Sequence, residues 1–329
     1  MVRFVIRRLL LAITTLFAIS IITFLLFFAV PTSPALVMCG KNCSPEQVSQ
    51  VEHRLGLDRP LVDQYGTFVK GVFVGRTIGS GDFVRNCPVP CLGYSFRTDE
   101  PVTSILKRTV PITASIVVGS AVLWLVIGVS LGMTSALRRG TLFDRVAIGT
   151  SLVGASLQVY FFGLILLLLL VYDTGILPAP AYTPITQNPG KWALGMLLPW
   201  ITLGFLNSAL YARLSRAQML ETLSEDYVRT ARAKGLPKRR VYIKHALRAA
   251  ITPIITIAGL DIGASLGGTV ITESIFGLQG LGRISVQAVE DLNLPIVLAT
   301  VLIAAAFIVF MNIVVDVLYA FIDPRVRLS

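Results

Sequence analysis

The sequence predicts an all-α integral membrane protein. Hydrophobic residues make up 54% of its 329 residues, charged residues only 14%, and the mean hydropathy is +0.75. A soluble domain carries about 25% charged residues, so this chain is too apolar to be one. Its apolar runs are continuous, as in Leu164–Val171, whereas the spans of a β-barrel are shorter and alternate polar with apolar residues. The fold class is therefore a bundle of transmembrane helices.

Six apolar runs come close to the roughly 20 residues that a helix needs to cross a bilayer. We expect spans at about 9–30, 112–136, 146–172, 194–212, 250–271 and 296–322. The third and sixth runs are long enough to tilt or to project from the membrane. The first follows three arginines, as in a signal peptide, but it exceeds the apolar core of about 7–15 residues of such a signal. No small-residue cleavage site follows it, so we expect an uncleaved helix.

Lysine and arginine residues set the expected orientation. The net charge is +11, but the basic residues interrupt apolar runs and do not cover a soluble surface, which argues against nucleic-acid binding. With both termini inside, the inner segments hold 18 Lys and Arg and the two short outer segments hold one each. The remaining 9 lie in a long outer segment, which the positive-inside rule discounts. Both termini are therefore expected in the cytoplasm.

The outer segment 31–111 is predicted to form a small helical cap. Ser44 can cap a short helix over 45–57, and Pro45 suits its first position. An apolar stripe at helical spacing begins there and continues after Pro60. Its members are Val48, Val51, Leu55, Leu61, Tyr65, Phe68 and Val69.

All four cysteines lie in the cap segment, as the pairs Cys39 with Cys43 and Cys87 with Cys91. Outside the membrane an even number of cysteines favours disulfides. A structural zinc site and free thiols are the alternatives. Four cysteines allow three pairings. A bridge between the pairs would close a loop of about 48 residues and contribute about 4 kcal/mol, whereas bridges within each pair would contribute less.

The longest inner loop, 213–249, contains a predicted short helix over 224–237. Ser224 is a suitable N-cap, acidic residues follow it at the positive end of the helix, and Gly235-Leu236-Pro237 is a stop signal. A solvated basic loop that touches anionic lipid is the alternative. That alternative does not explain a helix with both a start and a stop signal.

At this loop the sequence resembles the inner-membrane permeases of dipeptide and oligopeptide ABC importers. The run Asp226–Gly235 is similar to the loop through which these permeases contact their ATPase. Importer permeases more broadly carry Glu-Ala-Ala followed four residues later by glycine. Here Arg229-Thr230-Ala231 occupies the triplet, a departure that the peptide branch shares. Further stretches similar to the family are Leu55–Pro60, Gly81–Phe83, Tyr94–Thr98, Gly267–Gly268, Thr272–Glu273, Gly280–Gly282, Asp316 and Asp323–Arg325.

Two features depart from the family pattern. The cysteine pairs look like an insertion, and Gln158 stands where the family often has proline in the third helix. They leave the local structure of the cap and the geometry of the third helix open, and they do not affect the function that the resemblance implies.

The resemblance implies the transmembrane domain of a type I ABC importer in the bacterial inner membrane. The chain would form half of a peptide pathway with a second, homologous permease, expected to be non-identical in sequence. Two ATPase subunits would hold ATP and Mg, an extracytoplasmic binding protein would deliver substrate, and this chain would carry no cofactor or metal. The residues implied to contact the ATPase are Glu225, Asp226, Tyr227, Arg229, Ala231, Arg232, Lys234 and Gly235. Among them Tyr227, Ala231 and Gly235 share one helical face, with Tyr227 as the aromatic anchor.

Other function classes fit less well. The two histidines, His53 and His245, lie on opposite sides of the membrane, and the run 71–76 lacks the Walker A pattern. An enzyme, and an ATPase on this chain, are therefore not expected. A secondary transporter predicts charges or helix breaks repeated in two halves, which the sequence does not show. A related importer of nickel complexes, glutathione or another small solute stays open, since specificity in this family resides largely in the binding protein.

Two aspartates lie inside predicted spans, where a carboxylate is costly unless it has a partner or water. Asp316 follows Asn312 by one turn, and we expect a structural pair of Asp316 with Arg213 or Arg216; proton coupling is the alternative. Asp261 lies near the middle of the fifth span. It is predicted either to line the peptide path or to bond to a neighbouring helix.

Overall fold

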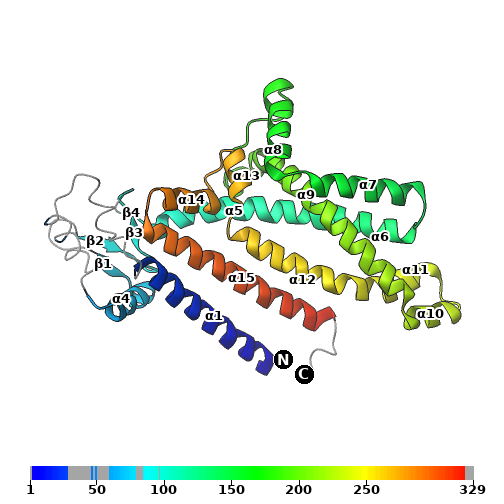
Figure 1. The fold of residues 1–329 in the computed structure, drawn as a ribbon, viewed down its shortest axis with the longest axis horizontal. Helices are drawn as coiled ribbons and strands as arrows, with labels where there is room; N and C mark the ends of the chain where they lie inside the picture. The colour runs from blue at the N-terminus through cyan, green and yellow to red at the C-terminus, as the bar shows by residue number, and fades with distance from the viewer. Residues whose placement is uncertain are drawn as a thin grey trace.

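The protein is described here from a computed structural model, which places residues 2–28, 46, 49, 59–78, 84–95 and 97–322. Figure 1 shows an elongated helical bundle. Short strands and helix α4 (Leu61–Val74) lie at one end, and helices α10 (Asp226–Ala233) and α11 (Lys238–Arg240) lie at the other. The two ends are therefore built from the predicted cap and from the predicted inner loop.

Five helices in the described part of the chain are long and apolar enough to cross a membrane. They are α1 (Val2–Phe28), the continuous run of α5 (Val102–Trp124), η2 (Leu125–Val129) and α6 (Ser130–Leu137), α9 (Pro189–Ser224), the continuous run of α11, η4 (Val241–Ala246) and α12 (Leu247–Leu266), and α15 (Leu294–Ile322). The prediction of an all-α membrane protein is confirmed. Most of these helices extend beyond the apolar runs that the sequence marks.

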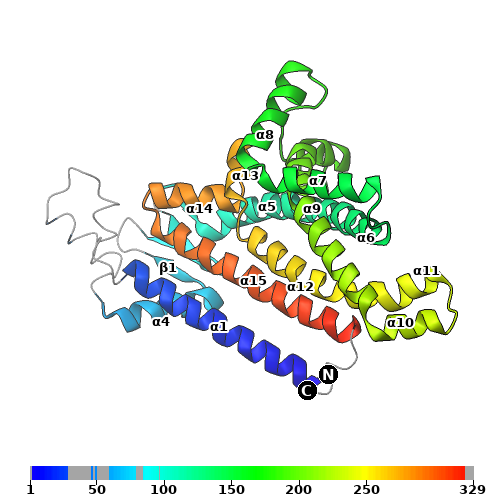
Figure 2. The same cartoon turned by 45° about the vertical axis from the view of Figure 1, so that its right-hand side comes forward.

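The third predicted span, 146–172, is not one continuous helix. It consists of α7 (Leu142–Ser156), then α8 (Val159–Leu167) with η3 (Leu168–Asp173), and the two parts meet at 97°. Figure 2 shows α8 leaving the bundle while α7 lies along it. Leu157 and Gln158 are extended, and the Ser156 hydroxyl donates to the carbonyl of Leu152 at 2.9 Å. Such back-bonding bends helices, and the geometry of the third helix, which the sequence left open at Gln158, is that of a bent pair.

The centre of the bundle is the contact between α9 and the α5–α6 helix. At Gly128 an added Cβ would lie 2.8 Å from the Ser208 carbonyl oxygen, and at Gly132 it would lie 2.3 Å from that of Ala212. Only glycine permits backbones to approach so closely. The residue numbers of the contacting pairs rise together, from Gly128 with Ser208 to Gly132 with Ala212, so the two helices are parallel. A core of Trp124, Tyr211 and residues of α12 fills the space beside them.

The cap is only partly helical. The predicted helix over 45–57 lies outside the described residues apart from residues 46 and 49. The later part of the apolar stripe does form a helix, α4. Beyond it, β1 (Arg76–Ile78) pairs antiparallel with β2 (Arg85–Cys87), and β3 (Tyr94–Ser95) pairs with β4 (Glu100–Pro101). These strands are too short to leave a periodic signal, so the sequence did not predict them.

A disulfide joins Cys87 at the end of β2 to Cys91, with 5.4 Å between their Cα atoms. The pairing is therefore within this pair and not between the two pairs. Cys39 and Cys43 lie outside the described residues. The Cys87–Cys91 bridge holds the turn that leads from one short sheet to the other.

The cap docks on the corner between two later helices, α14 (Leu281–Glu290) and α15. Arg97 pairs with the Asp291 carboxylate at 2.9 Å, and the Asn293 amide donates to the Ser95 hydroxyl at 2.7 Å. Val102, at the start of α5, is fully buried in an apolar cluster with Leu281 of α14 and Ile296 of α15. The cap and the end of the bundle are thus one packed unit.

Candidate functional site

The helix α10 is held at the far end of α9 by a reversal of the chain. Residue Glu225 has an extended backbone and separates the last residue of α9, Ser224, from Asp226. The Ser224 hydroxyl donates to the Glu221 carbonyl at 2.7 Å within α9. The expectation that Ser224 caps the short helix is therefore wrong, because the preceding helix continues through that residue. The position at the start of α10 belongs to Glu225, without a side-chain cap.

Gly235 ends α10. Its φ is +74°, and the Leu236 amide donates to the carbonyl of Ala231 while the Gly235 amide donates to that of Arg232. This arrangement resembles a Schellman ending, in which glycine is preferred because it adopts positive φ without strain. Leu236 then packs beside Val228 and Ala231. The predicted stop signal is confirmed.

The two faces of α10 differ sharply. Val228 is fully buried and Ala231 is 7% exposed, both packed against Val241 of η4. Ala231 therefore faces this chain, and its predicted place beside Tyr227 on the open face is wrong, since the return of the chain through η4 covers that side. Tyr227 is 46% exposed. Burial and, secondarily, the Glu225 carboxylate raise the pKa of its hydroxyl, so the ring stays neutral.

The open face of α10 is strongly charged. Asp226 and Arg229 point outward with side chains 97% and 69% exposed and lie 3.7 Å apart, and Lys234 and Gly235 are exposed. The guanidinium of Arg232 lies 6.0 Å from the centre of the Tyr242 ring, which orients this exposed arginine. The remaining residues of the predicted contact set are thus all exposed to solvent.

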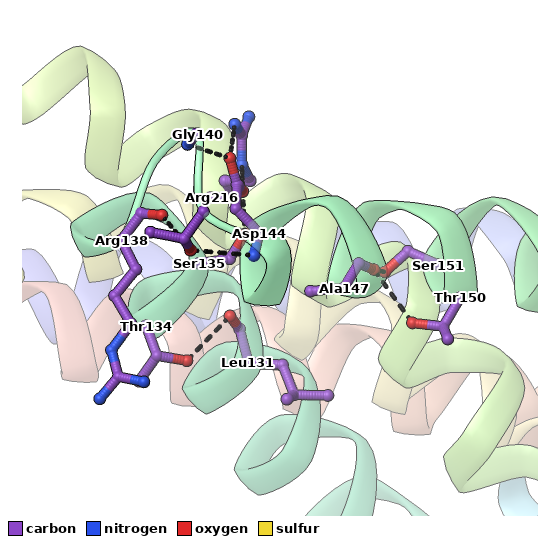
Figure 3. Close-up of polar contacts among 11 residues, drawn as sticks. Leu131, Thr134, Ser135, Arg138, Gly140, Asp144, Ala147, Thr150, Ser151 and Arg216 are labelled. Carbon is purple, nitrogen blue, oxygen red and sulfur yellow. Dashed lines mark hydrogen bonds and ion pairs between the residues drawn. The ribbon is translucent and has the colours of Figure 1, made fainter.

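A buried ion pair supports this end of the bundle, and the sequence did not single it out. Asp144, near the start of α7, accepts from Nε of Arg216 at 2.7 Å and from its Nη2 at 3.0 Å. The Gly140 amide and the Ser135 hydroxyl complete its bonding (Figure 3). The side chains of Asp144 and Arg216 are 5% and 23% exposed. The pair ties the turn between α6 and α7 to α9, about three turns before α10.

The ion pair predicted for Asp316 has a different partner. Arg8 of α1 lies 3.1 Å from the Asp316 carboxylate. The prediction of Arg213 or Arg216 is wrong, because α1 packs antiparallel to α15 and brings its basic end beside Asp316, while Arg216 is engaged by Asp144. Asn312 is exposed, so it lies outside a buried pair. The structural pairing of Asp316 with an arginine is otherwise as expected.

Asp261 of α12 bonds to a neighbouring helix. The Tyr211 hydroxyl of α9 donates to its carboxylate at 2.6 Å, and Tyr211 is fully buried and stacked on Trp124. Asp261 itself is half-buried. Of the two alternatives from the sequence, the hydrogen bond is present. The half-exposed carboxylate leaves the pathway-lining role a prediction.

A second buried carboxylate, Glu273, lies at the cap end on α13 (Val270–Ile275) and is fully buried. It accepts from the Thr113 hydroxyl at 2.7 Å, from the Arg283 amide at 2.8 Å and from the Thr269 hydroxyl at 3.2 Å. Gly280 packs against the carboxylate so closely that a Cβ would lie 2.3 Å from it. The sequence marked Thr272–Glu273 and Gly280–Gly282 only as similar to a family, and their spacing is explained by this contact.

Comparison with known proteins accounts for the whole chain. The model of the binding-protein-dependent transport system membrane component, N-terminal part, matches residues 1–117, and that of the binding-protein-dependent transport system inner membrane component matches residues 128–328. The chain belongs to this permease family. It is 33% identical to the dipeptide transport system permease protein DppB of Escherichia coli strain K12, over 99% of each chain. It is 32% identical to the DppB protein of Alkalihalophilus pseudofirmus, over 99% of this chain and all of that one.

Membership of the permease family makes the chain a multi-pass protein of the bacterial inner membrane. Within the described part of the chain, no group of three or more His, Cys, Asp or Glu residues could hold a metal ion. The described chain thus has one exposed short helix at the α10 end and four carboxylates with specific partners inside the bundle, Asp144, Asp261, Glu273 and Asp316.

Proposed function

We propose that this chain is one permease subunit of an ATP-driven peptide importer and that α10 is its contact with the ATPase. The proposal rests on the family and on the names of the relatives, which are dipeptide transport permeases. ATP and Mg are held by two separate ATPase subunits. A second permease completes the pathway, and an extracytoplasmic binding protein delivers the peptide. Both termini and α10 face the cytoplasm, as the distribution of basic residues indicates.

The observation that carries the assignment of α10 is its two-sided construction. Val228 and Ala231 fix the helix to its own chain, and Gly235 ends it sharply, so it is a rigid element with a defined orientation. Its open face presents a half-exposed tyrosine among charged side chains. Tyrosine and arginine are the residues that dominate binding energy at protein interfaces. A rigid element of this kind is what transmission of a rigid-body movement requires.

Asp261 is proposed to lie on the peptide path. Its carboxylate keeps an acceptor oxygen beyond the one that Tyr211 occupies, and the side chain is only half-buried. A peptide has a positively charged amino terminus, which a carboxylate attracts. An Asp261→Asn variant should then weaken uptake of free peptides more than of N-blocked ones; equal kinetics for wild type and variant with both would remove this role.

The test of the coupling role compares substitutions on the two faces of α10. Tyr227→Ala and Gly235→Leu should reduce both ATPase copurification and uptake of a labelled dipeptide, while the permease pair still assembles. An added Cβ at Gly235 meets nothing within 4 Å in this chain, so a steric effect there must come from a partner. Leucine at positive φ is also strained, and Gly235→Asn, which tolerates that conformation better, should be milder.

The matched control is Gly175→Leu. Gly175 also has positive φ, +61°, and nothing within 4 Å of its Cβ position, but it follows η3 and lies far from α10. It carries the same backbone strain without the proposed interface. Wild-type copurification and uptake in both α10 variants would show that this helix is not the coupling element. If the ATPase copurifies normally but labelled peptides do not enter, while a nickel complex or glutathione does, the peptide cargo is wrong and the permease assignment stands.

A further inference from the structure

The helix α4 presents an apolar surface that the rest of the described chain leaves uncovered. Val62 is 81% exposed and Phe73 is 75% exposed. They lie three turns apart on the same side of α4, because positions 11 residues apart come close to a whole number of helical turns. Figures 1 and 2 both show α4 beside the end of α1 that is remote from the N-terminus.

An adjoining edge of α4 packs on two membrane helices. Phe68 is buried against Phe24 of α1 and Leu298 of α15. Tyr65 meets Phe17 and Phe24 edge-on, and its hydroxyl bonds with that of Ser20 at 3.3 Å. This contact fixes the position of α4 relative to α1 and α15, which cross the membrane and therefore define its depth.

A third sector of α4 is polar. Asp63, Thr67 and Lys70 are exposed and follow one another at i, i+4 and i+3 spacing, which places them on one strip of the helix. Around its axis, α4 thus has an edge packed on membrane helices, then an exposed apolar surface, then a polar strip. In a cap helix surrounded by water, Val62 and Phe73 would expose an apolar surface to solvent beside the packed edge, which soluble surfaces avoid.

The depth of the contact follows from the length of α1. Arg8, paired with Asp316, marks the far membrane surface. At about 1.5 Å per residue, Ser20 lies about 18 Å and Phe24 about 24 Å from Arg8 along the helix, within a hydrocarbon layer about 30 Å thick. Phe17, which also touches α4, lies about 14 Å from Arg8, so the residues of α1 that touch α4 are about 6–16 Å below the near surface of that layer. The Phe24 contact, about 6 Å deep, falls within the depth of about 5–10 Å to which interfacial amphipathic helices are buried.

We propose that α4 is an interfacial helix, with Val62 and Phe73 inserted among the acyl chains of the lipid leaflet at the cap end of the bundle. The partner is lipid, because α4 packs on α1 at the depth where acyl chains lie, and α1 itself exposes Ile22, Leu25 and Leu26 at this end. Asp63, Thr67 and Lys70 point to the headgroups and water. The cap, which the sequence places outside the membrane, is by this proposal anchored within its surface.

The experiment uses a photoreactive benzoylphenylalanine at position 73 or 62 in the full permease complex. The complex is reconstituted in bilayers of phosphatidylethanolamine and phosphatidylglycerol and irradiated, with the substrate-binding protein present. The adducts are then identified by mass spectrometry. Position 67, on the polar strip of the same helix, is the matched control, and position 10 of α1, 60% exposed on a membrane span, is the positive control.

Lipid adducts should dominate at positions 73 and 62, as at position 10, and should be a minor product at position 67. A dominant adduct with the substrate-binding protein, or with another permease, at position 73 would overturn the proposal and assign the surface to that partner. Equal lipid labelling at 73 and 67 would also overturn it, because α4 would then have no fixed orientation. So would the absence of lipid adducts at 73 and 62 when position 10 gives them. A Cys87–Cys91 bridge found in each variant by non-reducing peptide mapping shows that the cap has folded.

Discussion

Replacement of Arg216 by methionine should be among the most destabilising single changes in the bundle. The Asp144 carboxylate, 5% exposed, receives four hydrogen bonds, and Arg216 supplies two of them. The variant leaves a charged, buried carboxylate without its cation. Removal of one partner from a buried pair costs about 3–5 kcal/mol of the free energy of unfolding. Arg216 is itself 23% exposed and can reach water, so the reverse change, Asp144→Asn, should cost less, about 1–3 kcal/mol.

The double variant makes the reasoning testable. Once Asp144 is neutral, the loss of Arg216 no longer strands a charge, so the two costs should not add. A coupling of about 1–3 kcal/mol is expected for groups in direct contact. The assay is unfolding of the purified permease by SDS titration, followed by circular dichroism. Arg213→Met, an exposed arginine one turn earlier on α9, is the control and should change little. Additive effects of the two substitutions, or an Arg216→Met variant as stable as the Arg213→Met control, would refute the assignment of a buried ion pair.

Three further predictions concern the cap end of the bundle. Gly280→Ala should destabilise the protein by about 1–3 kcal/mol, because the added Cβ would lie 2.3 Å from the buried Glu273 carboxylate. Gly149→Ala is the control, because its Cβ meets nothing within 4 Å and its φ, like that of Gly280, is not positive. Equal melting temperatures for the Gly280→Ala variant and wild type would contradict the prediction. Non-reducing peptide mapping should find Cys87 linked to Cys91. The Cys87→Ser, Cys91→Ser double variant should lose about 2 kcal/mol of the free energy of unfolding, the value for so short a loop. A peptide that links Cys87 to Cys39 or Cys43 would show the pairing to be wrong. The hydrogen bond from Tyr94 and, secondarily, that from Arg85 lower the pKa of Asp99 in the folded protein. Asp99 therefore stabilises the cap fully above the ordinary aspartate pKa of about 3.9. This stabilisation is lost as the pH falls below that value and passes through the lowered pKa. Hydrogen exchange of the β3–β4 amides should therefore be flat from neutral pH to about pH 5, after correction for the intrinsic exchange rate, and rise below about pH 4 in wild type but not in Asp99→Asn; the same acid response in both proteins would rule Asp99 out as its source.

The sequence predicted what depends on local pattern and missed what depends on distant pairing. Apolar runs marked the membrane helices, and the sequence Gly235-Leu236-Pro237 marked the end of α10, because both signals are contained within a few turns. The partner of Asp316 was wrong, since nothing in the local sequence shows that α1 and α15 are neighbours. Asp144 and Glu273 were missed as buried groups for the same reason.

In α10, helical spacing did not predict which side chains are buried. Tyr227 and Ala231 are one turn apart, so helical spacing alone places them on one face. The structure shows one exposed and the other buried, because the chain returns through Val241 and covers half of that face. A periodic pattern gives the angle between two side chains around a helix, but only the tertiary fold decides which of them is buried.

The tight contact of α9 with the α5–α6 helix has a mechanical consequence. Each helix has 36 residues, which gives a length of about 54 Å. Because their backbones touch at Gly128 and Gly132, one cannot slide along or roll over the other, and the two move as a single stiff rod. A rod about 54 Å long that tilts by about 10° about its middle carries its two ends about 5 Å in opposite directions, which is about half the diameter of a helix. A movement of the helix ends near α10 is therefore returned at the cap end as an equal and opposite change of helix spacing, without any rearrangement between the two helices.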